Sequence, residues 1–325
     1  MANITNYLNK IKTAVYGKDV RGAIHDAIKQ VYDDASVNHD NANMEVKMAR
    51  GTHNTLNDRL DNVDEIQAQT NAQLLHFIKN NGLQFPTYSN VVAHRGMMRL
   101  APENTLVSCE LASNYGFKFI EFDVSETSDG KFVVIHDSTV DAYTTKTGRV
   151  DSFTLAELKE MTITKGNNVA QYDNLTFPTL EEMLTVCKKE ELIPFVELKN
   201  ISNTSNAIEV YNILKKSGFN KTNCVIITSK REYVTCLRQA DKYIPIGYLE
   251  NPFTDDVVDY LTNVGNCIYI ANRYQFTEEN VAKLHNNNIL CAVYSPTGDG
   301  SIDLLSEKNE YIKRGVDFIM TGVLV

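Results

Sequence analysis

The pattern of apolar positions changes in character near residue 86. Before that point, apolar residues recur at helical spacing, and almost no segment alternates as a strand would. One series steps by alternating fours and threes, the heptad spacing of a coiled coil, with two polar residues at its centre: Leu56, Leu60, Val63, Gln67, Thr70, Leu74 and Phe77. We interpret residues 1–85 as a helical attachment and coiled-coil oligomerisation region. A helix packed onto the second half of the chain is the alternative.

The second region, 86–325, follows the helix breakers Gly82 and Pro86. Its short apolar runs predict eight strands, at 91–94, 118–124, 193–198, 224–227, 244–248, 267–270, 289–293 and 317–320. Amphipathic stretches between them predict helices, for instance at 104–115, 205–216, 230–240, 277–286 and 302–314. Strands joined by helical crossovers are typical of a (β/α)8 TIM barrel, an α/β fold. A further run at 131–137 follows a turn too closely for a crossover helix, and it predicts a hairpin after the second strand.

Composition and charge narrow the classes of partner. The 325 residues carry a formal net charge of −9, which argues against a general nucleic-acid binder, because such a protein needs a basic face. No run approaches the roughly 18 apolar residues of a membrane span, and the start of the chain lacks the apolar core of a signal peptide. We expect no nucleic-acid partner, no membrane span and synthesis in the cytoplasm without ordinary secretion. The six cysteines are scattered and are expected to be buried free thiols.

Acidic residues gather where the predicted strands end, which is where the active site of such a barrel lies. Glu121 and Asp123 are two residues apart on the second strand, so their side chains share one face. Glu197 lies near the end of the third predicted strand. Carboxylate oxygens at this density are typical ligands of a hard cation, Ca²⁺ or Mg²⁺, and they argue against structural zinc. We predict that these three residues bind a divalent metal.

Two histidines end apolar runs in the same part of the barrel. His94 follows the first strand and precedes Arg95, and His136 ends the hairpin run and precedes Asp137. A lone histidine on an apolar strand is usually a packed core residue. Because histidine titrates near neutral pH, however, a pair can divide the tasks of general base and general acid. We predict that His94 and His136 are catalytic.

The segments AHRG, PENT, EFDV, SDGKFVVIHD and VELK, in this order, make the second half very similar to the glycerophosphodiester phosphodiesterase family. The likeness runs from about residue 90 to residue 325. The resemblance implies a phosphodiesterase in which Glu121, Asp123 and Glu197 hold the metal. It also implies that His94 and His136 are the acid–base pair.

The same resemblance implies roles for residues beside this set. Arg95 would contact the phosphate of the substrate, and Lys199 would help to neutralise it. Glu103, in the loop after the first strand, matches a glutamate near the metal and is expected to be a further ligand. Asn104 or Thr105 is expected to cap the first helix of the barrel. For Asn104, capping alone is the alternative to a role in the site.

The sequence departs from the family pattern at two places. The family often carries a tryptophan in a late strand, but this chain has no tryptophan, and Tyr294 is expected to supply the aromatic wall for the glycerol moiety. The usual acidic residue near the chain end is replaced by Gly322. Both changes concern the shape of the substrate site and leave the predicted catalytic set whole.

The segment 7–34 resembles the N-terminal segment of tail and baseplate proteins from phages of Gram-positive bacteria. This resemblance implies a homotrimer in the virion tail, attached to other phage tail proteins, that degrades a glycerol-phosphate wall polymer, teichoic acid. This phage tail enzyme is the first of three hypotheses. The second is a cytoplasmic enzyme that acts on small glycerophosphodiesters. The third is a module that binds the wall polymer without turnover.

Overall fold

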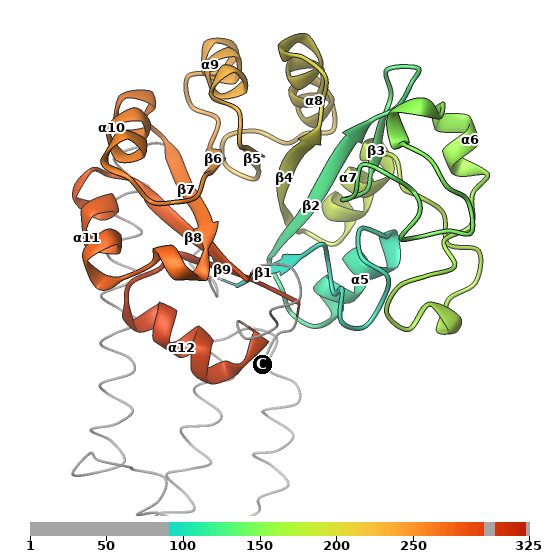
Figure 1. Ribbon diagram of the computed structural model, residues 1–325, viewed down its shortest axis with the longest axis horizontal. Coiled ribbons are helices and arrows are strands. Elements are labelled where there is room, and N and C mark those ends of the chain that lie inside the picture. Colours follow the sequence, from blue (N-terminus) through green and yellow to red (C-terminus); the bar gives the residue numbers. More distant parts are fainter. Residues whose placement is uncertain (1–90, 296–302, 323–325) are drawn as a thin grey trace, which may run out of the picture. The chain divides into compact units, whose positions relative to one another are not determined.

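A computed structural model describes residues 91–295 and 303–322, and these residues form a closed barrel (Figure 1). Each barrel strand is parallel to its neighbours, and the ring closes where β1 pairs with β2 and with β9. The strands are β1 (Val91–His94), β2 (Phe119–Glu126), β4 (Ile193–Asn200), β5 (Val225–Thr228), β6 (Ile246–Leu249), β7 (Cys267–Asn272), β8 (Leu290–Tyr294) and β9 (Phe318–Thr321). The predicted TIM barrel is therefore confirmed. The predicted helical region at 1–85 and the heptad series lie outside the described residues.

Helices follow the strands and cover the outside of the ring. They are α5 (Leu106–Asn114), α7 (Leu180–Lys189), α8 (Thr204–Lys216), α9 (Arg231–Ala240), α10 (Asp255–Val264), α11 (Glu278–Asn286) and α12 (Leu305–Lys313). The short helix α6 (Leu155–Lys159) lies between β2 and α7, beside the barrel (Figure 1). Short 3₁₀ turns occur at Val150–Ser152, Val169–Gln171 and Arg273–Gln275. Thr105, and not Asn104, is the N-cap of α5, and its hydroxyl accepts a hydrogen bond from the N–H of Ser108. None of the described helices is both long and apolar enough to cross a membrane.

Two apolar layers hold the barrel together, because its strands are buried on both faces. The inner layer fills the ring with side chains such as Phe119, Phe195 and Phe318, whose rings pack edge to face. The outer layer lies between the strands and the helices. Gly247 on β6 has no side chain for a reason of space, since a Cβ there would meet Cδ1 of Ile270 at 2.6 Å. The ring interior is thus a packed core of apolar side chains.

The segment between β2 and α7 is an insertion that packs beside the barrel (Figure 1). Its strand β3 (Phe132–Val134) is antiparallel to β2, which confirms the predicted hairpin. The insertion has a small apolar core of its own, which includes Val140, Leu158 and Phe177. The hairpin places the residues that follow β3 beside the carboxyl end of β2, where the predicted site lies.

Candidate active site

The three predicted metal ligands lie together at the mouth of the barrel. In the register of the strands, Glu121 on β2 is opposite His94 on β1, and Asp123 is opposite Glu197 on β4. One carboxylate oxygen from each of the three acidic residues lies within 4.8 Å of the others. Glu121 and Asp123 are nearly inaccessible to solvent, and Glu197 is 16% exposed. The structure therefore brings all three side chains to one point.

The electrostatics of this group fit a bound cation. Burial and the neighbouring Asp123 and Glu197 raise the pKa of Glu121 well above its ordinary value. Burial also raises the pKa of Glu197. Oε1 of Glu121 is buried and has no hydrogen-bond partner among the described residues. A buried carboxylate oxygen without a donor, in a cluster of oxygen ligands, is what a hard divalent cation would complete.

Two basic side chains reach the same carboxylates. Nζ of Lys199 donates to Oε1 of Glu197 at 2.9 Å and lies 3.6 Å from Oδ1 of Asp123. Arg95 donates its backbone N–H to Oε2 of Glu121 at 3.0 Å. Burial tends to raise the pKa of Asp123, but the charges of Arg95, His136 and Lys199 outweigh it and lower that pKa. Asp123 is consequently ionised at neutral pH.

Asn104 orients Asp123 through two hydrogen bonds. Its amide Nδ2 donates to Oδ2 of Asp123 at 2.9 Å, and its Oδ1 accepts from the backbone N–H of Asp123 at 3.2 Å. Asn104 is buried and has a φ of 57°, a conformation that asparagine tolerates better than most residues. The sequence left open both a role in the site and capping alone for Asn104. The structure makes this residue the partner of a predicted metal ligand.

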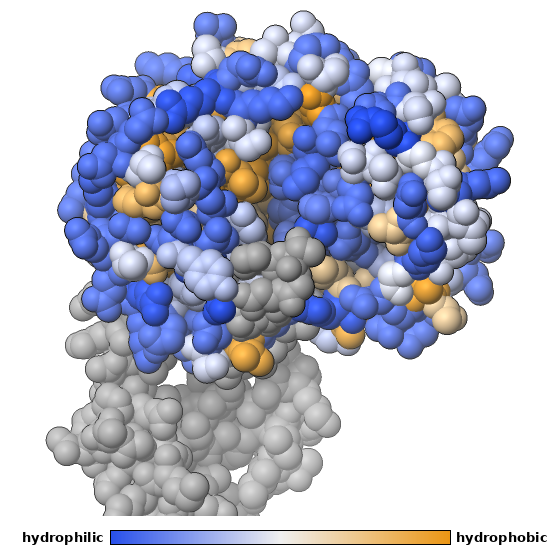
Figure 2. Space-filling view, viewed as in Figure 1, coloured by the Kyte–Doolittle hydropathy of each residue, from blue (hydrophilic) through white to orange (hydrophobic). Residues whose placement is uncertain are grey.

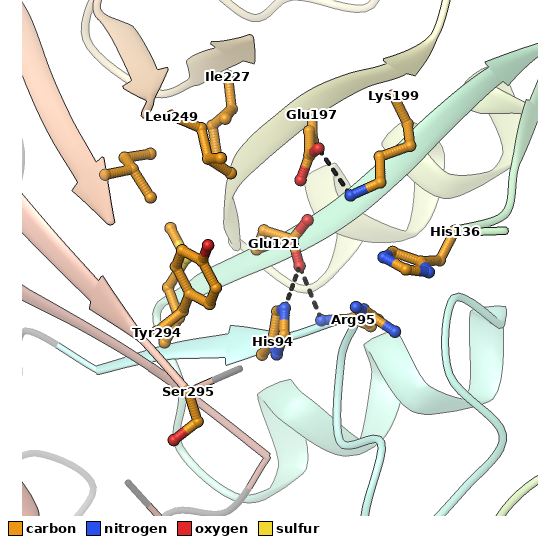
Figure 3. Close-up of a pocket in the computed structure, with 12 residues that line it drawn as sticks. His94, Arg95, Glu121, His136, Glu197, Lys199, Ile227, Leu249, Tyr294 and Ser295 are labelled. Carbon is orange, nitrogen blue, oxygen red and sulfur yellow. Dashed lines mark hydrogen bonds and ion pairs between the residues drawn. The ribbon is translucent and has the colours of Figure 1, made fainter. Parts of the chain in front are cut away.

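The two predicted catalytic histidines line the same cavity and come from different elements. His94 ends β1, and its Nε2 lies 3.7 Å from Oε2 of Glu121. Burial, with a further contribution from Arg95, lowers the pKa of His94 to about 3, so its ring is neutral at pH 7. His136 follows the insertion hairpin, and its Nδ1 shares a hydrogen bond of 2.6 Å with Oδ1 of Asp137. Arg95 lies between the two rings in Figure 3.

Glu103 lies outside the group of three carboxylates, and its role as a further metal ligand stays a prediction. Both of its oxygens accept hydrogen bonds from Nη1 of Arg95, at 3.1 and 3.0 Å. Its Oε1 also accepts from the hydroxyl of Tyr143, in the insertion, at 3.0 Å. Glu103 is therefore engaged in holding Arg95. Tyr143 was missed in the sequence, because no local pattern indicates that an insertion residue reaches the first loop of the barrel.

The cavity at this mouth has a volume of about 190 Å³ and two unlike walls. One wall carries His94, Arg95, Glu121, His136, Glu197 and Lys199. The other wall is apolar, as Figures 2 and 3 show on the side of β5, β6 and β8. The apolar wall consists of Ile227, Leu249, Ile270, Tyr294 and Met320. Tyr294 lies in this wall, as expected for an aromatic surface, and its hydroxyl accepts from Nδ2 of Asn251 at 3.1 Å. The cavity can hold a small molecule with one charged and one aliphatic side.

The sequence of this chain is similar to a known family of phosphodiesterases. The model of the glycerophosphoryl diester phosphodiesterase family matches residues 94–324. A glycerophosphodiester phosphodiesterase of Caldanaerobacter subterraneus is 36% identical over 157 residues, which are 48% of this chain and 63% of that protein. Glycerophosphodiester phosphodiesterase 1 of Mus musculus is 28% identical over 166 residues, which are 51% of this chain and 50% of that protein. The match therefore spans about half to two thirds of these relatives.

Solved structures share the architecture. A phosphodiesterase of Oleispira antarctica, in complex with the product sn-glycerol-3-phosphate, superposes with a TM-score of 0.65 at 23% identity, covering 72% of this chain and 93% of that one. A glycerophosphodiester phosphodiesterase of Thermotoga maritima gives a TM-score of 0.55 at 22% identity, covering 72% and 95%. At this level of identity the likeness shows the barrel fold.

Proposed function

Because this chain belongs to the glycerophosphoryl diester phosphodiesterase family, we propose that it hydrolyses glycerophosphodiester bonds with the help of a divalent cation. One observation carries the proposal. Two histidines, an arginine and the carboxylates of Glu121 and Glu197 line one cavity of the size of a small ligand, and a carboxylate oxygen of Asp123 lies within 4.8 Å of theirs. Glu121, Asp123 and Glu197 would hold the cation, and their oxygen ligands favour Ca²⁺ or Mg²⁺.

The reaction exchanges one P–O bond for another. A bound cation would neutralise the charge of the phosphodiester and polarise its P–O bonds. One histidine of the pair His94 and His136 removes the proton of the attacking oxygen as the new P–O bond forms. The other gives a proton to the alkoxide as the bond to the leaving alcohol breaks. The attacker is water, or the neighbouring glycerol hydroxyl, which would first give a cyclic phosphate.

Arg95 and Lys199 position and stabilise the phosphoryl group in this scheme. The guanidinium of Arg95 is held by Glu103 and lines the cavity between the histidines, so it can donate to phosphoryl oxygens. Lys199 adds a second positive charge on the side of Glu197. The apolar wall with Tyr294 would receive the carbon skeleton of the glycerol unit.

The substrate that we favour is a poly(glycerol phosphate) teichoic acid, cleaved by a protein of a phage tail. The resemblance of segment 7–34 to tail proteins supports this choice, and so does the repeated glycerophosphodiester bond of the polymer. The alternative is a cytoplasmic enzyme for small glycerophosphodiesters. A binding module without turnover is the third hypothesis, and the full set of acid–base residues in one cavity counts against it.

Digestion of purified glycerol teichoic acid and of glycerophosphoglycerol separates these hypotheses. A tail enzyme should release glycerol phosphate from the polymer at least as efficiently, per bond, as it cleaves the small diester. Cleavage of the small diester alone supports the alternative. Binding of the polymer without release of product from either substrate would contradict the proposed enzyme.

We also infer that the full chain is a homotrimer, because tail proteins of the type that segment 7–34 resembles are built in that way. The catalytic groups all come from one chain, so residues 86–325 alone should be monomeric and active on small diesters. Loss of linked sites should lower the efficiency on polymer. Light scattering on both forms tests this proposal, and a monomeric full chain would contradict it.

A further inference from the structure

A second cavity adjoins the first at the point where the chemistry is expected. It has a volume of about 300 Å³ and shares Arg95 and His136 with the first cavity. Its remaining walls come from the first loop of the barrel and from the insertion: Met98, Pro102, Glu103, Asp137, Ala142, Tyr143, Lys165, Gly166 and Asn167. A diester whose phosphate lies at Arg95 would therefore have one substituent in each cavity.

The two cavities differ in chemistry, and this difference distinguishes the two substituents. The first has an apolar wall on the side of β5, β6 and β8 (Figure 3), whereas the insertion supplies the second with the charged and polar side chains of Asp137, Lys165 and Asn167. The acidic groups of the second cavity already have partners. Glu103 accepts from Arg95 and Tyr143, and Asp137 pairs with His136. These carboxylates are thus occupied and do not define the ligand of the cavity.

Lys165 is the cation that remains available in the second cavity. Its Nζ donates to the main-chain oxygen of Asp141 at 2.7 Å, and no carboxylate pairs with it within 91–295 and 303–322. An ammonium group has three donors. The bond to Asp141 uses one of them and restrains the side chain at the cavity, so two donors and the charge are left for a ligand.

The loop that carries Lys165 is built against the barrel. The backbone N–H groups of Thr164 and Lys165 both donate to the carbonyl of Tyr143. Gly166 has a φ of 124°, and a Cβ there would meet Pro102 at 3.0 Å, so glycine permits this close approach. Nδ2 of Asn167 donates to the carbonyl of Met98 at 2.7 Å. The rim is therefore fixed before any ligand binds, which limits the entropy that binding costs.

We propose that this second cavity binds the leaving alcohol of the substrate and that Lys165 pairs with a further phosphate group on that alcohol. The proposal rests on the proposed function and names its substrate class, a glycerophosphodiester with a second phosphate beyond the scissile one. A repeating glycerol phosphate chain carries such a group on every internal unit. Lys165 is then a specificity-determining residue that makes the enzyme prefer the polymer to a single diester.

The test compares two substrates that differ by one phosphate. They are glycerophosphoglycerol and the same diester with a phosphate monoester on its leaving glycerol. The measured quantity is the ratio of kcat/KM for the phosphorylated substrate to that for the plain one. Because Lys165 is exposed, the contribution of one charge-assisted contact to this preference should be modest. We therefore expect Lys165→Gln to lower the ratio about three- to tenfold. The ratio for the wild-type protein should also fall as salt is added.

Two control variants show whether the effect is specific to the charge at position 165. Lys165→Arg retains the charge and should retain most of the preference. Lys146→Gln removes the same charge from an exposed position of the same insertion that lines neither cavity, and it should leave the ratio unchanged. Circular dichroism verifies the fold of each variant.

The outcomes separate this inference from the proposed function. An unchanged ratio in Lys165→Gln, with plain diester still cleaved by the wild-type protein, overturns the subsite and leaves the phosphodiesterase in place. A fall of the same size in Lys146→Gln also overturns the subsite, because the effect then comes from the loss of any positive charge on the insertion. A wild-type protein that cleaves neither substrate overturns the proposed function and the inference with it.

Discussion

Substitution of Asn104 by glycine tests whether the support of Asp123 matters for metal binding. Asn104 has positive φ, which glycine adopts without strain, so Asn104→Gly removes the side-chain hydrogen bonds and leaves the backbone path allowed. The lost bonds are the one from Nδ2 to Oδ2 of Asp123 and the one from the N–H of Asp123 to Oδ1. Asp123 would keep its charge partners Arg95 and Lys199 but would lose its fixed orientation.

The size of the effect follows from the bond to the carboxylate. A hydrogen bond to a charged group contributes about 1.5–3 kcal/mol. If that free energy is expressed in metal affinity, it corresponds to roughly 10- to 150-fold, at about 1.4 kcal/mol per factor of ten. Loss of a partner that orients a metal ligand typically costs about 10- to 100-fold in affinity. We expect Asn104→Gly to weaken binding of Ca²⁺ or Mg²⁺ within this range.

The assay is calorimetric titration of metal into the purified protein, paired with the metal concentration that half-restores activity. The matched control is Asn288→Gly, since Asn288 also has positive φ but is exposed and lies before β8, at the other end of the barrel. That control should titrate like the wild-type protein. Wild-type metal affinity in Asn104→Gly, with its fold intact, would refute the reasoning.

Two more predictions follow from the geometry. In steady-state kinetics, His94→Ala and His136→Ala should each lower kcat by a factor of about 10²–10⁴. If both residues act in one step, the double variant should lose less than the product of the two factors. A wild-type rate in either single variant would remove that residue from the mechanism. For His285, burial opposes protonation, but the bond to Asp317 outweighs it and raises the pKa above the ordinary 6.5. This stabilisation should be complete below pH 6.5 and should disappear as the pH rises through the raised value. As the pH rises from 6.5 through the raised pKa, the free energy of unfolding in urea should fall less for His285→Gln than for the wild-type protein. Equal losses would contradict the contribution of protonated His285 to stability.

The barrel could be predicted because its strands are short apolar runs that alternate with amphipathic helices. The predicted strand at 91–94 coincides with β1, and the others were placed within a few residues of their limits. The strand β2 extends to Glu126, beyond the predicted end at 124, because its last residues pair with the hairpin of the insertion. That pairing is a tertiary contact, and the apolar pattern does not contain it.

The candidate site was predictable where its residues lie at strand ends. Glu121, Asp123 and Glu197 share a mouth because the side chains of a strand alternate with a period of two. The contacts of Glu103 could not be predicted, because the direction of a loop side chain depends on its partners, here Arg95 and Tyr143. For Asn104, capping alone and a role in the site could not be separated, since its partner Asp123 is distant in sequence. Contacts of this kind become visible only when the elements are placed in space.

The most direct test of the central claim is the metal dependence of hydrolysis of glycerophosphoglycerol. After chelation and desalting, the wild-type protein should release no glycerol phosphate, and added Ca²⁺ or Mg²⁺ should restore the rate. Glu197→Gln should fold normally, because Glu197 lies near the end of β4 at the mouth, but its activity should not return when metal is added. A full rate after exhaustive chelation would contradict the assignment of Glu121, Asp123 and Glu197 as ligands of a catalytic cation.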